Sequence, residues 1–209
     1  MNEHKNVMLK AIMAGLFIGI AGLIFLSVEN KVIGSVLFSF GLLMVVSKGY
    51  YLYTGKVGYL LPYEKGYLFI LGKTLLGNFI GITSVGLLFR FSGMTAVIVQ
   101  ANELFNLKTS NLWYETLVLA ILCGMMMYIG VQSYKVMKLD ILKVLMVMMA
   151  VVIFILAKFE HSVANMLYIA VGNTWSWKAL LYVFIWVVGN GIGSIALNLV
   201  EVKLNQESN

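Results

Sequence analysis

The sequence predicts an all-α membrane protein in which six transmembrane helices form two inverted three-helix repeats, with the second and fifth helices broken. Composition is the first reason, because 61% of the 209 residues are hydrophobic and only 11% are charged, proportions that do not suit a soluble domain. Arrangement is the second reason, because the apolar residues form six blocks without charge: 11–28, 32–47, 74–89, 116–134, 144–157 and 179–200. These blocks are apolar all round, whereas the helices of a soluble bundle need a polar face.

The expected helices follow these blocks in order. Spans at about 10–28, 66–91, 112–135 and 177–200 are long enough to cross a bilayer core, which takes roughly 20 apolar residues as a helix. The spans that begin at residues 32 and 140 stop early, at Lys48 and Lys158, and each is followed by a polar stretch and further apolar residues. We therefore expect a broken second helix, a broken fifth helix, and a loop over residues 90–111.

Matching motifs in the two halves of the chain indicate an internal repeat. Lys48 and Lys158 are 110 residues apart, and the Gly-Asn pairs that begin at Gly77 and at Gly189 are 112 residues apart. Three spans per half turn the second half upside down, and inverted repeats with paired broken helices indicate a transport site near the bilayer midplane. We expect repeats at about 10–100 and 112–203 within one transmembrane domain covering residues 1–209.

The basic residues predict the orientation of the chain. The net charge is +6, but the lysines are scattered between spans and form no patch with aromatic residues, so we expect no nucleic-acid partner. If the amino terminus is cytoplasmic, the inner flanks hold Lys5, Lys10, Lys56, Lys65, Lys73, Lys135, Lys138, Lys143 and Lys203, and the outer flanks hold Lys31, Arg90, Lys108 and Lys178. Under the positive-inside rule, this predicts a multi-pass protein of the cytoplasmic membrane with both termini in the cytoplasm.

The two breaks are the expected site of function, because non-helical backbone inside a membrane is tolerated only where protein covers it or where it lines a cavity. A half-helix that starts at a break directs free N–H groups and a positive dipole end toward it, which favours an anion. Lys48 and Lys158 would add positive charge at the same level. The alternative is that Lys158 pairs with Glu160 and that Lys48 extends toward the membrane interface.

His161 is the one histidine within the expected spans, since His4 precedes the first of them. One histidine there excludes a multi-histidine metal site within one chain, and the single Cys123 excludes a cysteine metal site, so we expect no metal and no cofactor. Asn165 follows His161 by four residues and shares its face if a helix restarts at the break. The imidazole can donate a hydrogen bond to an anion or exchange a proton with it, or, in a membrane enzyme, act with Glu160 as acid and base.

The segment Phe159-Glu160-His161-Ser162-Val163-Ala164-Asn165-Met166 resembles the signature of the formate/nitrite transporter family. The resemblance extends over nearly the whole chain, including Leu52-Tyr53-Thr54-Gly55 and the two Gly-Asn pairs. It implies an aquaporin-like six-span fold, assembly as a homopentamer with a pore in each protomer, and passage of small monovalent anions of weak acids such as formate, nitrite, hydrosulfide or lactate. Such a protein is a channel or a proton-coupled transporter.

The resemblance also implies roles for single residues. Leu52 with Tyr53 would form the cytoplasm-side constriction, and Phe154 would help form the periplasm-side one. The implied polar contacts are Thr54 and His161 hydrogen-bonded to the anion, Asn190 lining the passage, and Lys108 attracting anions at the outer vestibule.

The chain departs from the family pattern by having Lys48 and Lys158 where small residues are usual and Tyr51 where an acidic residue is common. Added positive charge could favour conduction of the anion itself, as in a purely electrogenic channel for fluoride or chloride. A neutral-solute pore of aquaporin-like architecture is a further alternative, but it would need paired Asn-Pro-Ala loops, and Pro62 is the only proline in the sequence.

Overall fold

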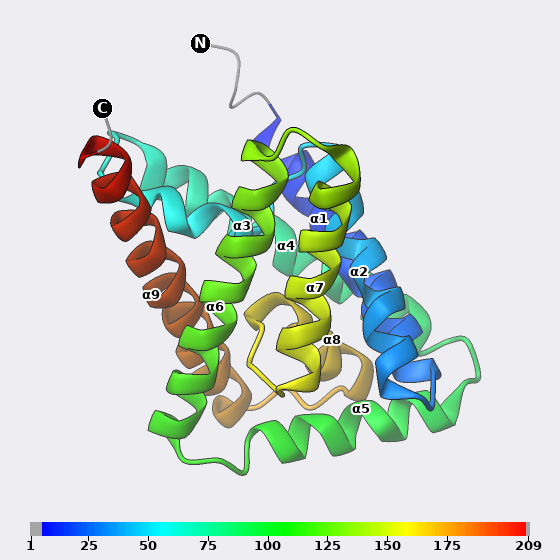
Figure 1. Cartoon of the computed structure of the whole chain (residues 1–209). Coiled ribbons are helices and arrows are strands. Elements are labelled where there is room, and N and C mark those ends of the chain that lie inside the picture. Colours follow the sequence, from blue (N-terminus) through cyan, green and yellow to red (C-terminus); the bar gives the residue numbers. More distant parts are fainter. Residues whose placement is uncertain (1–5, 208–209) are drawn as a thin grey trace.

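A computed structural model of the chain describes residues 6–207, so His4 and Lys5 lie outside the described residues. All regular elements in this range are helical (Figure 1). The long ones are α1 (Val7–Ser27), α2 (Lys31–Ser47), α4 (Tyr67–Phe89), α6 (Trp113–Val136), α7 (Asp140–Leu156) and α9 (Trp177–Glu207). The shorter ones are α3 (Tyr53–Lys56), the 3-10 helix η1 (Val57–Leu60), α5 (Thr95–Lys108) and α8 (Ser162–Gly172).

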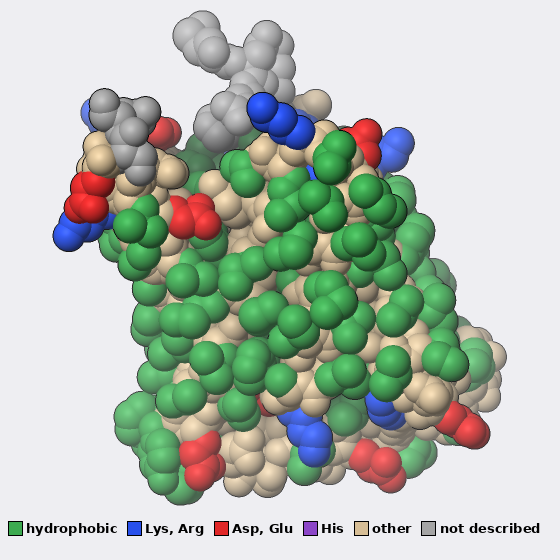
Figure 2. Space-filling model, viewed as in Figure 1, with side chains coloured by type: hydrophobic (Ala, Val, Ile, Leu, Met, Phe, Trp, Pro, Cys, Tyr) green, Lys and Arg blue, Asp and Glu red, His purple; other side chains and the backbone are tan. Residues whose placement is uncertain are grey.

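The helices have the length and surface of membrane-spanning elements. Among the described residues, α1, α4, α6 and α9 are long and apolar enough to cross a bilayer, while α2 and α8 are shorter apolar helices. Hydrophobic side chains cover the middle of the visible face, and the charged side chains gather toward its two ends (Figure 2). The start of α1 and the end of α9 lie at the same end of the molecule (Figure 1).

The two early helix ends occur where the sequence predicts them, and both have the same hydrogen-bond pattern. At the end of α2, the Gly49 and Tyr50 N–H groups donate to carbonyls three and five residues back. At the end of α7, Lys158 and Phe159 donate in the same way. This is the Schellman ending, in which one residue takes a left-handed conformation. That residue is Gly49 in one half, with φ 63°, and Lys158 in the other, with φ 58°. The structural counterpart of Lys158 is therefore Gly49 rather than Lys48, one residue away from the pairing expected from sequence.

The connection between α4 and α6 differs from the expected loop over residues 90–111. It contains α5, a 14-residue helix that runs across one end of the molecule beneath the other helices (Figure 1). Only the segments on either side of α5 are irregular. This helix lies against α8, and its last residue, Lys108, reaches Glu160 in the segment between α7 and α8.

Glycines allow two helix pairs, α1 with α4 and α6 with α9, to pack closely. A Cβ atom on Gly81 would meet the backbone carbonyl oxygen of Ile12, and one on Gly193 would meet that of Ile121. These contacts involve backbone atoms, which cannot move aside as a flexible side chain would. Gly81 and Gly193 therefore allow the backbones of their helix pairs to approach closely in both halves.

We expect Gly81→Ala to destabilise the protein by about 1–3 kcal/mol, because the added methyl group forces α4 away from α1. Gly72→Ala is the matched control on the same helix, since a Cβ at Gly72 meets no atom within 4 Å. Thermal unfolding of both variants in detergent measures the effect. Equal midpoints for the two variants would contradict this account of the α1–α4 contact.

Candidate functional site

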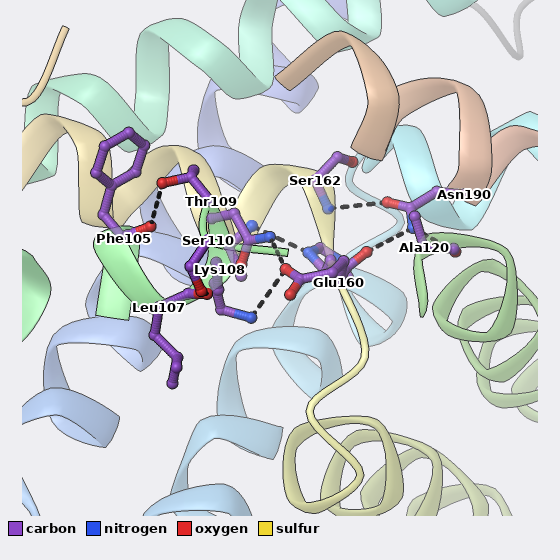
Figure 3. A network of polar contacts seen from close by, with 12 residues as sticks. Phe105, Leu107, Lys108, Thr109, Ser110, Ala120, Glu160, Ser162 and Asn190 are labelled. Carbon is purple, nitrogen blue, oxygen red and sulfur yellow. Dashed lines mark hydrogen bonds and ion pairs between the residues drawn. The ribbon is translucent and has the colours of Figure 1, made fainter. Parts of the chain in front are cut away.

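The break between α7 and α8 is held by the side chain of Asn190 from α9. Its Oδ1 accepts from the Ser162 N–H at 2.8 Å, and its Nδ2 donates at 2.8 Å to the backbone oxygens of Ala120 and Glu160 (Figure 3). The Asn190 side chain is fully buried, and both of its amide protons are used. Asn190 therefore fastens the break, whereas the family resemblance had implied that it lines the passage.

Asn78 from α4 holds the other break in the same way. Its Oδ1 accepts from the Tyr53 N–H at 2.8 Å, and its Nδ2 donates to the backbone oxygens of Ala11 at 2.8 Å and Tyr51 at 2.7 Å. At each break, an asparagine thus satisfies one N–H group that the sequence analysis had expected to face an anion. At the start of α8, the side chains of Asn190 and His161 also accept from the Ser162 and Ala164 N–H groups, so protein groups satisfy part of this positive helix end.

His161 and Thr54 connect the two breaks directly. Thr54 Oγ1 and His161 Nε2 are 2.9 Å apart, although the two residues are 107 positions apart in the sequence. The Nδ1 atom of His161 accepts from the Ala164 N–H at 3.0 Å, so His161 caps the start of α8. Because Nδ1 accepts, the ring proton lies on Nε2 and is donated to Thr54. The Thr54 hydroxyl proton is then available for another acceptor.

Two phenylalanines extend from the histidine ring. Phe154 stacks on His161 with ring centroids 5.4 Å apart and an interplanar angle of 20°, and Phe38 contacts Phe154 edge-on at 6.1 Å. Phe154 is 3% exposed. It therefore covers one side of the imidazole, at the place where the sequence analysis expected a constriction.

Glu160 is a buried carboxylate beside the histidine, and its partner is Lys108 rather than Lys158. Lys108 Nζ lies 2.9 Å from Glu160 Oε2 (Figure 3). The Asn165 amide donates to the same oxygen at 2.5 Å. The Glu160 side chain is 3% exposed. Burial makes an unpaired charge costly, so Lys108 and Asn165 together stabilise the carboxylate. Lys108 is thus a structural partner of Glu160 as well as a cation near the site.

Two separate cavities lie on the two sides of this arrangement. The large cavity has a volume of about 570 Å³, and its lining includes Phe154, Lys158, Glu160, His161 and Asn165. The small cavity has a volume of about 90 Å³, and its lining includes Tyr50, Leu52, Gly55, Lys56 and Lys135. The Thr54–His161 hydrogen bond joins the chain segments that line them.

The remaining residues expected at the site are placed less centrally. Lys48 is exposed at the end of α2 and lines neither cavity, and Lys158 is exposed at the large one. Tyr53 is buried, and its hydroxyl donates to the Val187 carbonyl of α9 at 3.1 Å. This bond holds α3 against α9, and Tyr53 is not among the residues that line the two cavities.

Sequence reasoning missed Lys31, Phe25 and Phe38 in the lining of the large cavity. All three lie in or beside apolar runs with no motif around them, and they reach the cavity only because α1 and α2 pack against α7 and α8. No local signal distinguishes them from other residues of these helices.

Comparisons with known proteins agree on one family. A model of the family "Formate/nitrite transporter" matches residues 2–202. The formate channel FocA of Haemophilus influenzae is 30% identical over 157 residues, a match that covers 68% of this chain and 54% of that protein. The chain therefore spans about half the length of that relative.

Two solved structures share the fold. An FNT family ion channel superposes with a TM-score of 0.81 at 20% sequence identity, covering 95% of this chain and 89% of the other. A pentameric formate channel with formate bound gives a TM-score of 0.76 at 20% identity, covering 95% of this chain and 94% of that one.

We expect Asn190→Ala to lower the stability of the protein by about 1–3 kcal/mol or more, because it leaves buried backbone groups of Ser162, Glu160 and Ala120 without partners. Thermal unfolding in detergent measures this loss. Asn106→Ala is the control, because Asn106 is exposed on α5. If both variants unfold at the wild-type temperature, Asn190 does not hold the break.

Proposed function

Because this chain belongs to the formate/nitrite transporter family of membrane channels, which are not enzymes, we propose that it passes small monovalent anions of weak acids. The substrate class is that of formate, nitrite, hydrosulfide and lactate. The observation that carries the proposal is the Thr54–His161 hydrogen bond between two cavities. The relative FocA is a formate channel, which supports the same class.

The proposed pathway runs from the large cavity past Phe154 to the Thr54–His161 pair, and on past Leu52 to the small cavity. Thr54 has a hydroxyl proton free to donate to an anion oxygen, because its own oxygen accepts from His161. The rest of the throat is apolar, and a bare anion is costly there. A permeant that takes up a proton crosses such a throat as a neutral acid. His161 stays neutral in this scheme, since protonating Nδ1 would break the bond from the Ala164 N–H.

We also propose the finer layout of the fold. Three features of the first half recur in the second: an asparagine that holds the break, a Schellman helix ending and a close glycine contact between helices. This recurrence supports two inverted repeats of three spans within one domain. The start of α1 and the end of α9 share one end of the molecule (Figure 1), and the lysine distribution favours a cytoplasmic location for that end. The large cavity, at the opposite end with α5, then opens to the outside.

The proposed assembly is a homopentamer in the lipid membrane, with one pathway in each protomer. The support is the shared fold with a pentameric formate channel. Native mass spectrometry of the purified protein tests it, and a population of single chains alone would contradict the proposal.

We expect Thr54→Val to slow formate uptake at least about tenfold, because loss of one hydrogen bond to a charged group costs roughly 1.5–3 kcal/mol. Uptake of formate, nitrite, hydrosulfide and lactate into proteoliposomes, followed with an internal pH-sensitive dye, measures the rates. Ser84→Ala on the exposed side of α4 is the control. If none of the four anions enters faster than into protein-free liposomes, or if water flow alone rises, the anion pathway is wrong.

Variants of Lys48 and Lys158 distinguish proton-coupled passage of the neutral acid from electrogenic conduction of the anion. If they promote passage of the anion itself, Lys48→Ala and Lys158→Ala lower the anion conductance in planar bilayers and shift its reversal potential. We expect the larger effect from Lys158, which lines the large cavity, whereas Lys48 lines neither cavity. Unchanged conductance for formate, chloride and fluoride in both variants would remove these lysines from the conduction mechanism.

A further inference from the structure

We propose that the large cavity is a binding site for an amphipathic organic carboxylate, with Lys158 and Lys31 as its cationic contacts, and that this ligand blocks the pathway from the outside. The blocking effect rests on the proposed function. The binding itself rests on the cavity alone.

The cavity is larger and more apolar than a small permeant anion requires. Its volume of about 570 Å³ lies within the range of roughly 300–1,000 Å³ found for pockets that hold drug-sized ligands. Much of its wall consists of Phe25, Phe38, Leu104, Leu107 and Phe159. Formate or nitrite would leave this wall in contact with water. A ligand with an aryl or branched alkyl group would cover it and gain the free energy of apolar burial.

The charge of the cavity favours an anionic ligand. Three lysines line it, and only Lys108 is neutralised, by Glu160. Lys31 contacts neutral groups. Its Nζ atom lies 4.9 Å from the centre of the Phe25 ring. It also lies 2.7 Å from the side-chain oxygen of Gln100, in the amide orientation that satisfies both the oxygen and the nitrogen of that side chain. No carboxylate of the described residues lies within ion-pair distance of Lys31 or Lys158. The cavity therefore has two uncompensated positive charges above an apolar wall.

The backbone at Lys158 supports a role for its side chain. Lys158 has φ 58° at the end of α7, where the matching end of α2 has Gly49. A side chain is strained in this left-handed conformation, and glycine avoids the strain. Strained residues of this kind cluster at ligand sites, where the strain is offset by a functional contact.

The base of the cavity explains why such a ligand would block rather than pass. Phe154 and His161 stack there, and the large and small cavities are separate. A carboxylate with a rigid aryl group would place its charge at the lysines and its ring against the apolar wall, and would stop above this ring pair.

The first test is binding of 3-phenylpropionate to the purified protein in detergent, measured by isothermal titration calorimetry. Acetate supplies the charge without the ring, and 3-phenylpropanamide supplies the ring without the charge. We expect 3-phenylpropionate to bind at least about tenfold more tightly than either. Lys158→Gln should weaken its binding by about tenfold, the loss of one contact of roughly 1.4 kcal/mol. Lys31→Gln should also weaken it, while Lys178→Gln, an exposed lysine outside the cavity, should not.

The proposal is overturned if 3-phenylpropionate does not bind, if the amide binds equally well, or if neither Lys158→Gln nor Lys31→Gln weakens binding.

The second test adds 3-phenylpropionate to the outside or the inside of proteoliposomes with oriented protein and measures formate uptake relative to each variant's own uninhibited rate. Block from the outside alone is expected, and equal block from the inside would overturn the outer location. Binding of 3-phenylpropionate without any formate uptake would contradict the proposed function and support the binding site. Formate uptake without binding of 3-phenylpropionate would contradict the binding site and support the proposed function.

Discussion

The need to satisfy backbone hydrogen bonds inside a membrane is the constraint on which the rest of this structure depends. Two helices end within the protein, and each ending frees N–H and C=O groups that hydrocarbon cannot satisfy. Asn78 and Asn190 meet this need with three backbone hydrogen bonds each. Because these amides fix the two breaks, Thr54 and His161 come within hydrogen-bond distance of each other.

The second requirement is to accommodate charge beside that apolar centre. Glu160 is that charge, and it contacts three helices. Its backbone oxygen accepts from Asn190 of α9. Its carboxylate contacts Lys108 of α5 and Asn165 of α8. This network attaches α5 to the break. Glu160 also neutralises Lys108. The net charge of the large cavity therefore comes from Lys31 and Lys158, which do not contact this network. The same construction that stabilises the break therefore leaves the cavity positive.

The parts of the fold that could be predicted from sequence are those with local signals. The ends of α2 and α7 were predicted correctly because a lysine follows each apolar block, and the long spans because they lack charge. The helix α5 was missed because its residues are neither uniformly apolar nor bounded by a recognisable cap. The pairing of Lys48 with Lys158 was wrong by one residue, because the register of the two endings is set by bonds to helix carbonyls, which match Gly49 to Lys158.

The sequence by itself determined that this chain is a helical membrane protein, where its helices break, and, through the segment around His161, its family. Each of these is recorded in neighbouring residues, as composition, block length or motif. Only the tertiary structure decided that Asn190 fastens a break, that Glu160 pairs with Lys108, and which side chains line the large cavity. These contacts join residues that are distant in the sequence. Ser162 and Asn190 are 28 positions apart, and Lys108 and Glu160 are 52 positions apart. Their formation depends on how the helices pack, which no local pattern specifies.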